Sequence, residues 1–297
     1  MAKYIFLILL GASFVACKKV NLDSLAFPYE SLDQYAFDSY DDPEIIIDDS
    51  LKATMSLVNL ISMKSFSSET GEEYTIYGVY IGDTNSIATD SIIVYLHGQS
   101  RHMDYYWTRS ALLANTGYKY QYGVFVFDYR GYGMSEGKPS ETGLYEDADA
   151  AIDWLISKGA QGSRTFYYGY SLGAIPAIDR AAYREDFTPA KLIIESPLAS
   201  VQYLTQSSTV ITVDSKFVST LEFDNAEKIK DIQIPLMWLH GVEDTYVNIS
   251  NGELIFENAA SPYKEAHRIE GSGHSEVPVL MGYDNYLQVL ENFILKN

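Results

Sequence analysis

One stretch, RTFYYGYSLGAIPAID at residues 164–179, constrains the fold of this chain more than any other. It predicts a short apolar strand, Thr165–Tyr168, then the pentapeptide GYSLG, then a helix that begins near Leu172. A Gly-x-Ser-x-Gly sequence between a strand and a helix is typical of a sharp turn that holds its serine strained and exposed. Gly169 and Gly173 are needed because neighbouring backbone passes where a Cβ atom would otherwise lie.

Ser171 is therefore the candidate nucleophile. The following helix would aim its first N–H groups and its positive dipole end at the serine, where an oxyanion would form. A second match, GMSEG at residues 133–137, lacks this context because Lys138-Pro139 follows it instead of a helix. Ser135 is the weaker alternative.

Short apolar runs alternate with helical patterns from residue 91 onward. The runs are rich in Ile, Val, Leu and Tyr and do not alternate with polar residues, which predicts parallel strands covered on both faces. They lie at Ile92–Leu96, Gly123–Phe127, Thr165–Tyr168, Lys191–Ile194, Pro235–Leu239 and Ala266–Ile269. Helices are expected around residues 143–158, 251–260 and 283–296. The sequence therefore predicts an α/β fold with a mostly parallel, doubly covered sheet.

The N-terminus has the pattern of a signal peptide over residues 1–16. A single cation, Lys3, precedes an apolar run that is too short to span a bilayer, and small residues precede Cys17, the only cysteine. This arrangement resembles a bacterial lipobox, which implies cleavage before Cys17 and attachment of lipid to it. We expect a protein of the bacterial cell envelope that is anchored to the lipid bilayer; an ordinary secreted protein with an incidental cysteine is the alternative.

The remaining chain divides into a polar, acidic N-terminal part and one large domain. We expect residues 17–60 to form a tether and a peripheral segment with a helix over 53–61, and residues 61–297 to form the domain, beginning with a hairpin over 63–81. Within it, the Ser/Thr-rich stretch 198–232 predicts a small lid, with two ordinary surface helices as the alternative. The net charge of −19 opposes binding to nucleic acid.

A serine hydroxyl needs a base to take its proton and a carboxylate to orient that base. Three of the five histidines follow Ser171: His240 and His267 belong to strand patterns, whereas His274 lies in the glycine-rich loop GSGHS, where a base would be presented. The loop after the strand at 235–239 offers Glu243 and Asp244 as the acid. Asp214 is a more distant rival.

Five motifs occur in a fixed order: HGQS, FDYRGYGMSEG, GYSLG, HGVEDTYV and GSGH. Together they resemble the α/β-hydrolase superfamily, and in particular its small-lid serine hydrolases of the acylaminoacyl-peptidase-like and alpha/beta-hydrolase-domain kind. The resemblance covers about residues 63–296 and implies the α/β-hydrolase fold.

The resemblance also implies roles for individual residues. Ser171 would be the nucleophile, Asp244 the acid and His274 the base, while the backbone N–H groups of Gln99 and Leu172 would form the oxyanion hole. The implied function is that of a serine hydrolase that cleaves a carboxylic ester or related acyl bond of a small molecule through an acyl-enzyme. We expect no metal and no cofactor, because no His/Asp/Glu cluster has the spacing of ligands.

Two other functions stay open. A serine peptidase would need acidic groups to hold a free amine, and residues of the 198–232 stretch could supply them: Asp214, Glu222, Asp224 and Glu227. A non-catalytic binding protein with the same fold is the third possibility. Aromatic residues near the motifs predict either a substrate pocket or ordinary core packing: Tyr105, Tyr106, Trp107 and Tyr170.

Overall fold

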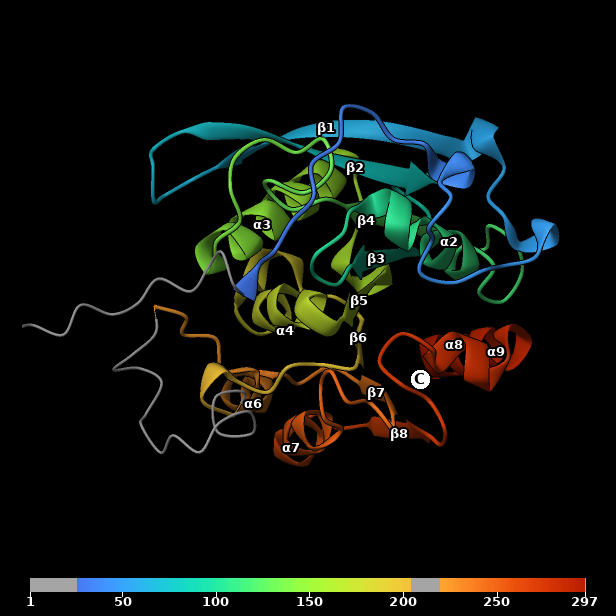
Figure 1. The fold of residues 1–297 in the computed structure, drawn as a ribbon, viewed down its shortest axis with the longest axis vertical. Coiled ribbons are helices and arrows are strands. Elements are labelled where there is room, and N and C mark those ends of the chain that lie inside the picture. Colours follow the sequence, from blue (N-terminus) through green and yellow to red (C-terminus); the bar gives the residue numbers. More distant parts are fainter. Residues whose placement is uncertain (1–25, 204–219, 297) are drawn as a thin grey trace, which may run out of the picture.

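A twisted sheet with helices on both faces organises the molecule (Figure 1). The structure is a computed structural model that describes residues 26–203 and 220–296. The expected signal peptide and Cys17 lie outside this range. Within the described residues, no helix is both long and apolar enough to cross a membrane.

The described strands follow the apolar runs of the sequence closely. They are β1 (Val58–Phe66), β2 (Glu73–Ile81), β3 (Ile92–Leu96), β4 (Gly123–Phe127), β5 (Thr165–Tyr170), β6 (Lys191–Glu195), β7 (Leu236–Gly241) and β8 (Lys264–Ile269). Their order in the sheet is β1-β2-β4-β3-β5-β6-β7-β8. β1 pairs antiparallel with β2, and β2 with β4, whereas all later pairings are parallel. The predicted mostly parallel sheet is confirmed.

The helices cover the sheet in two layers. The described α-helices are α2 (Met103–Leu113), α3 (Glu141–Ser157), α4 (Ala174–Tyr183), α6 (Asn225–Lys228), α7 (Ser250–Asn258), α8 (Val277–Met281) and α9 (Tyr283–Leu295). Apolar side chains of α3, α4, α6 and α7 pack on one face, and those of α2 and α9 pack on the other (Figure 1). Both faces of the parallel strands are therefore shielded from water.

β3 shows how one strand contributes to both layers. Val94 and Leu96 belong to the core beneath α3 and α4, while Ile93 and Tyr95 belong to the core beneath α2 and α9. Because successive side chains of a strand point to opposite faces, a run without polar residues is what a doubly covered strand requires.

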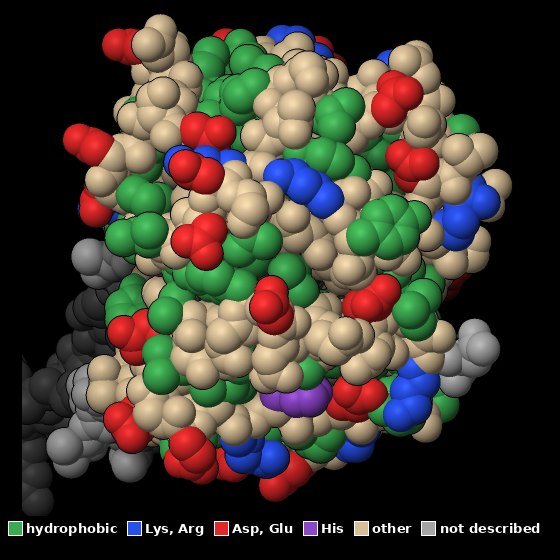
Figure 2. All heavy atoms as spheres, turned by 90° about the vertical axis from the view of Figure 1, so that its right-hand side faces the viewer, with side chains coloured by type: hydrophobic (Ala, Val, Ile, Leu, Met, Phe, Trp, Pro, Cys, Tyr) green, Lys and Arg blue, Asp and Glu red, His purple; other side chains and the backbone are tan. Residues whose placement is uncertain are grey.

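Charged side chains are dispersed over the face of the molecule that Figure 2 shows. On the face that carries α8 and α9, acidic and basic side chains are interspersed, and the described Lys and Arg side chains do not gather into one patch (Figure 2). The sequence as a whole has an excess of acidic residues, with a net charge of −19.

The predicted helix over residues 53–61 is wrong. A short 3-10 turn, Met55–Leu57, leads directly into β1, in which Val58 pairs with Ile81 and Phe66 with Glu73. The expected hairpin is present, but its first strand begins earlier than the sequence indicated. Pairing with β2 along nine residues outweighs the weak helical pattern of this segment.

Residues 17–60 are expected from the sequence to form a tether and a peripheral segment; in the described part, residues 26–57, the chain packs on the domain instead of forming a free tether. Phe27, Ile45 and Ile47 are buried, and the backbone N–H groups of Ala36 and Phe37 donate to the Asp104 carboxylate at 2.6 and 2.7 Å. Phe27 packs in the core layer of α3 and α4, whereas Ile45 and Ile47 pack in the layer of α2 and α9, so the few apolar residues of this segment reach the core between polar ones.

The stretch expected to form a lid is described only at its flanks, residues 198–203 and 220–232. These flanks pack on the domain: Val201, Phe223 and Ile229 are buried in the core layer that contains α4. The segment between them lies outside the described residues, and the lid stays a prediction.

The turn after β5 is held by an extremely close approach of two backbone segments. A Cβ atom at Gly173 would lie 1.9 Å from the Leu96 carbonyl oxygen at the end of β3. A Cβ atom at Gly169 would lie 2.7 Å from Cα of Ala174. Neither backbone atom can move without displacing a strand or a helix, so both positions require glycine.

We expect Gly173→Ala to lower the free energy of unfolding by about 2–3 kcal/mol or more, because the added methyl group overlaps main-chain atoms. Gly71→Ala, at the tip of the β1–β2 hairpin, is the control for the added methyl group: Gly71 has a positive φ, +76°, whereas Gly173 has a φ of −63°, but no described atom lies within 4 Å of a Cβ placed at Gly71. That variant should lose about 1 kcal/mol. Urea unfolding followed by tryptophan fluorescence measures both, and equal losses would contradict the close approach.

Candidate active site

Ser171 occupies the strained position that the sequence predicts. Its φ is +51°, a conformation that few residues other than glycine adopt, and it lies at the carboxyl end of β5. The helix does not start at once. A 3-10 turn, Ser171–Gly173, comes first and α4 begins at Ala174.

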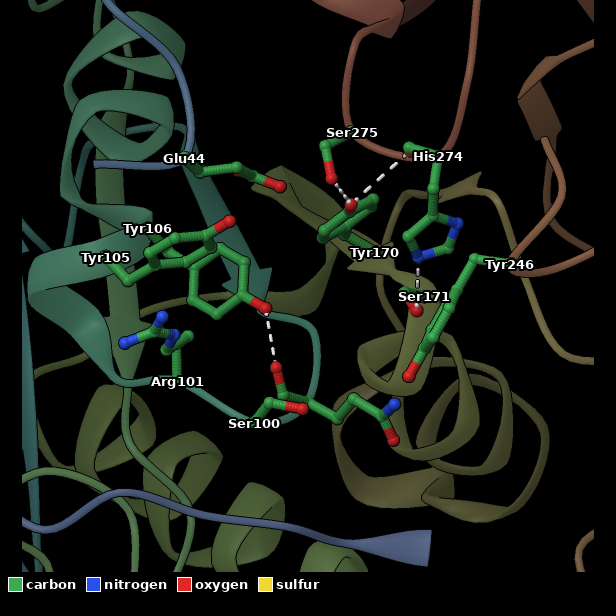
Figure 3. Close-up of a pocket in the computed structure, with 11 residues that line it drawn as sticks. Glu44, Ser100, Arg101, Tyr105, Tyr106, Tyr170, Ser171, Tyr246, His274 and Ser275 are labelled. Carbon is green, nitrogen blue, oxygen red and sulfur yellow. Dashed lines mark hydrogen bonds between the residues drawn. The ribbon is translucent and has the colours of Figure 1, made fainter. Parts of the chain in front are cut away.

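His274 and Asp244 lie beside this serine, although all three come from different parts of the chain. The Nε2 atom of His274 is 2.9 Å from Oγ of Ser171, and its Nδ1 atom is 2.7 Å from Oδ2 of Asp244 (Figure 3). The structure therefore brings the predicted nucleophile, base and acid together in one chain of hydrogen bonds.

The Asp244 carboxylate is fixed by four contacts. Its Oδ1 accepts hydrogen bonds from the backbone N–H groups of Tyr246, at 2.9 Å, and Val247, at 2.8 Å. Its Oδ2 lies near two histidines, His274 and His240, the latter with Nε2 at 3.2 Å. These contacts leave the carboxylate little freedom to rotate.

His240, which the sequence placed at a strand, supports the acid through hydrogen bonds of its ring. The indole N–H of Trp238, which can only donate, points at Nδ1 of His240 at 3.2 Å. Nδ1 is thus the acceptor, and the proton of the neutral ring lies on Nε2, which faces the Val247 carbonyl oxygen at 2.9 Å and Asp244. His240 supports the acid from the side opposite His274.

These contacts determine the ionisation of Asp244. Burial by itself would raise the pKa of this carboxyl, but hydrogen bonds from His240 and His274, with that from the Val247 N–H, hold the pKa well below its ordinary value of 3.8. Asp244 is therefore a carboxylate at any pH near neutrality, as a residue that orients an imidazole needs to be.

The loop after β3 approaches Ser171 from the other side. Nε2 of His97, buried beneath this loop, lies 3.1 Å from the Asp128 carboxylate. Gln99 lines the same pocket as Ser171, and its backbone N–H has no acceptor among the described residues. Leu172 is in the first turn of the following helix, where N–H groups lack partners within the helix. Both predicted oxyanion donors thus border the serine.

A pocket of about 380 Å³ opens at Ser171. It is lined by residues of five separate regions of the sequence: Glu44, Gln99, Ser100, Arg101, Tyr105, Tyr106, Tyr170, Ser171, Tyr246, His274 and Ser275 (Figure 3). Of the aromatic residues singled out in the sequence, Tyr105, Tyr106 and Tyr170 line the pocket. Trp107 instead is buried in the core, and its indole N–H donates to Asp38 at 2.6 Å.

The rival residues do not join this site. Ser135 is buried and bonded to backbone, donating to the Asp128 carbonyl oxygen at 2.9 Å. His267 lies near Glu265, at 3.4 Å, and Glu243 is exposed. Asp214 lies outside the described residues.

Of the four acidic residues considered for binding an amine, the structure describes Glu222, Asp224 and Glu227, and the side chains of the last two have partners outside the pocket. The Asp224 side chain accepts from the Glu227 N–H and so caps α6, and the Glu227 carboxylate pairs with Lys230 at 2.6 Å. The backbone N–H of Glu222 donates to the Glu141 carboxylate at 2.6 Å. None of the three lines the pocket at Ser171.

One carboxylate of the pocket, Glu44, was missed in the sequence because it lies in the segment that we expected to be a tether. The signal that could have found it is the run Ile45–Ile47 beside it, since apolar residues in an acidic segment indicate contact with the core. Among the described residues, no group of three or more His, Cys, Asp or Glu side chains has an arrangement that could hold a metal ion.

Comparisons with known proteins agree with this architecture. A family model described as "Serine aminopeptidase, S33" matches residues 88–231. Alpha/beta hydrolase domain-containing protein 17B of Homo sapiens is 35% identical over 189 residues, which are 62% of this chain and 60% of that protein. Alpha/beta hydrolase domain-containing protein aho-3 of Caenorhabditis elegans is 34% identical over 188 residues, 62% of this chain and 52% of that protein. The chain thus matches less than two thirds of the length of either relative.

Solved structures show the same fold at low sequence identity. The esterase Pf2001 of Pyrococcus furiosus superposes with a TM-score of 0.61 and 18% identity, covering 86% of this chain and 98% of the esterase. Est1E from Butyrivibrio proteoclasticus, solved with bound ferulic acid, has a TM-score of 0.60 and 15% identity over 75% of this chain and 95% of its own. These superpositions show that the chain has the α/β-hydrolase fold.

The lowered pKa of Asp244 predicts a specific loss of stability in acid. A carboxyl whose pKa is lower in the folded protein contributes stability above its unfolded pKa, and this contribution disappears as the pH falls through the folded pKa. We expect the difference in unfolding free energy between the wild type and Asp244→Asn to be constant from about pH 7 to pH 5 and to shrink below about pH 4. Urea unfolding at a series of pH values measures it. A difference that stays the same down to pH 3 or lower, while the protein is still folded, would contradict the lowered pKa.

Proposed function

We propose that this protein is a serine hydrolase that cleaves a carboxylic ester or related acyl bond through a covalent acyl-enzyme. The observation that carries the proposal is the hydrogen-bonded chain from Oγ of Ser171 through His274 to Asp244, with distances of 2.9 and 2.7 Å. A small-molecule acyl compound would bind in the adjoining pocket. No cofactor or metal is needed for this chemistry.

Acylation begins when Nε2 of His274 takes the proton of the Ser171 hydroxyl as its oxygen attacks the substrate carbonyl carbon. Asp244 accepts a hydrogen bond from Nδ1–H, keeps the ring in the tautomer that leaves Nε2 free, and stabilises the imidazolium. The N–H groups of Gln99 and Leu172 would donate to the oxyanion of the tetrahedral intermediate.

Release of the products reverses the proton transfer. The imidazolium of His274 gives its proton to the leaving alcohol, and the carbonyl re-forms as the bond to that alcohol breaks. A water molecule then enters, His274 removes one of its protons, and the resulting hydroxide attacks the acyl group on Ser171. The acid is released, and the serine recovers its proton from His274.

A serine peptidase on the same three residues is the second candidate. The description of the matching family model as a serine aminopeptidase favours it. The engagement of Asp224 and Glu227 outside the pocket argues against the amine site that we first considered. Ester hydrolysis therefore remains the preferred function, and the third candidate, a non-catalytic binding protein, has no support from the geometry of the site.

We expect Ser171→Ala and His274→Ala each to lower kcat for 4-nitrophenyl acyl esters by at least about 10³-fold, because the three residues act as a unit. Ser135→Ala, in the second Gly-x-Ser-x-Gly sequence, is the matched control and should keep the activity of its folded fraction. Rates near the wild-type value in His274→Ala would overturn its role as the base. Faster turnover of aminoacyl 4-nitroanilides than of the esters would favour the peptidase.

We also propose that the protein is lipid-anchored in the bacterial cell envelope. The sequence pattern around Cys17 is the sole support, since an N-terminal lipid would hold the domain at a membrane without a spanning helix. In a bacterial host, the wild type should incorporate labelled fatty acid and sediment with membranes. Cys17→Ser should lose both properties while it keeps ester turnover. An unlabelled wild type in the aqueous fraction would contradict the anchor.

A further inference from the structure

The pocket at Ser171 contains a buried carboxylate that the proposed reaction does not use. The Glu44 side chain is only 1% exposed, yet it lines the pocket together with Ser171 and His274. Figure 3 shows it reaching toward Tyr170 and Ser275 from the side opposite Tyr246. Burial of a carboxylate beside a reaction centre is costly and needs a physical reason.

An ion pair with Arg109 of α2 offsets part of the cost of burying the Glu44 carboxylate. Nε of this arginine donates to Oε2 of Glu44 at 2.7 Å, Nη1 donates to Glu195 at 2.7 Å, and Nη2 donates to the Ser275 carbonyl oxygen at 3.0 Å. The guanidinium has thus distributed its donors over three acceptors. Arg109 donates only one hydrogen bond to Glu44, instead of the two parallel hydrogen bonds of a bidentate arginine–carboxylate pair.

The other oxygen of Glu44 is left without a partner. Oε1 is fully buried and accepts no hydrogen bond from any described residue. The Tyr170 hydroxyl acts on this carboxylate but does not reach ordinary hydrogen-bond geometry with Oε1; it lies 2.9 Å from Oγ of Ser275, a contact in which either oxygen can be the donor. Glu195, by contrast, uses both oxygens, since its Oε2 accepts from the Tyr168 hydroxyl. Of the two carboxylates paired with Arg109, the unsatisfied one is the one that lines the pocket.

The net charge of Arg109, Glu44 and Glu195 also indicates that Glu44 would be stabilised by a hydrogen-bond donor. One guanidinium faces two carboxylates, so the three groups together carry one negative charge if both acids are ionised. Burial raises the pKa of Glu44, and so does the neighbouring Glu195, against the lowering effects of Arg109 and the Tyr170 hydroxyl. Any hydrogen-bond donor at Oε1 would supply the missing hydrogen bond, and an ammonium group would also neutralise the excess negative charge.

We propose that Glu44 is a specificity residue that binds a hydrogen-bond donor, an ammonium or a hydroxyl group, on the substrate of Ser171. This inference rests on the proposed hydrolase activity and names the chemistry of its substrate. A carbonyl attacked by Ser171 would carry, on its acyl or its alcohol part, a donor that reaches Oε1. Glu44 lies outside residues 88–231, the part matched by the family model, so this feature belongs to the chain's own N-terminal segment.

The test compares esters that differ only at the chain end. One set consists of methyl esters of hexanoic acids that end in ammonium, hydroxyl or methyl. The other consists of butanoates of four-carbon alcohols with the same three ends. In at least one set, the wild type should show a kcat/KM for the ammonium or the hydroxyl ester that is at least about 10-fold above that of the methyl-terminated ester. Comparing the ammonium with the hydroxyl ester decides whether charge adds to the hydrogen bond.

Two variants locate the effect. Glu44→Gln keeps the shape but lets an amide N–H₂ face the pocket, so the preference for a donor should disappear while turnover of the methyl-terminated esters persists. Asp42→Asn is the matched control, since Asp42 is an exposed carboxylate near Arg101, at 3.5 Å, that does not line the pocket. It should keep the preference.

The outcomes separate this inference from the proposed function. Equal kcat/KM values for the three chain ends in both sets would overturn the role of Glu44 and leave the hydrolase intact. A preference that persists in Glu44→Gln would also overturn it. No turnover of any ester by folded wild type would instead remove the proposed function itself. If Glu44→Gln fails to fold, the comparison of the three chain ends on the wild type still tests whether the enzyme prefers an ester with a hydrogen-bond donor.

Discussion

The close approach between the turn after β5 and the end of β3 is the constraint on which the site depends. Gly173 lies against the Leu96 carbonyl oxygen with no room for a side chain, and Ser171 takes a positive φ to make the turn. The same contact places the serine beside the loop that starts at His97. Close packing here therefore determines both the position of the hydroxyl and the N–H groups that face it.

Parallel strands explain how distant residues reach this point. The carboxyl ends of β3, β5 and β7 lie at one edge of the sheet, so the loops that follow them meet there. Asp244 comes from the loop after β7, and His274 from the loop after β8. Interactions beneath the surface then refine the arrangement: Trp238 sets the tautomer of His240, and His240 helps to hold Asp244.

Most of the sheet could be predicted because unbroken apolar runs such as Ile92–Leu96 have few alternatives to a buried strand. The secondary structure of residues 53–61 could not be predicted in the same way. Its strand depends on long-range pairing with β2, which leaves little pattern in the local sequence. The convergence of Ser171, Asp244 and His274 followed from the motifs and their order. Glu44 was missed since its importance comes from Arg109, which lies far along the chain, and from an unpaired oxygen that no sequence pattern reveals.

Covalent trapping of the serine tests the central claim most directly. The folded protein would be treated with a fluorophosphonate, which requires an activated serine hydroxyl, and the modified residue identified by peptide mass spectrometry. We expect a single adduct on Ser171, formed much more slowly in His274→Ala. A folded wild-type protein whose Ser171 stays unmodified would contradict the account of this site as a catalytic one.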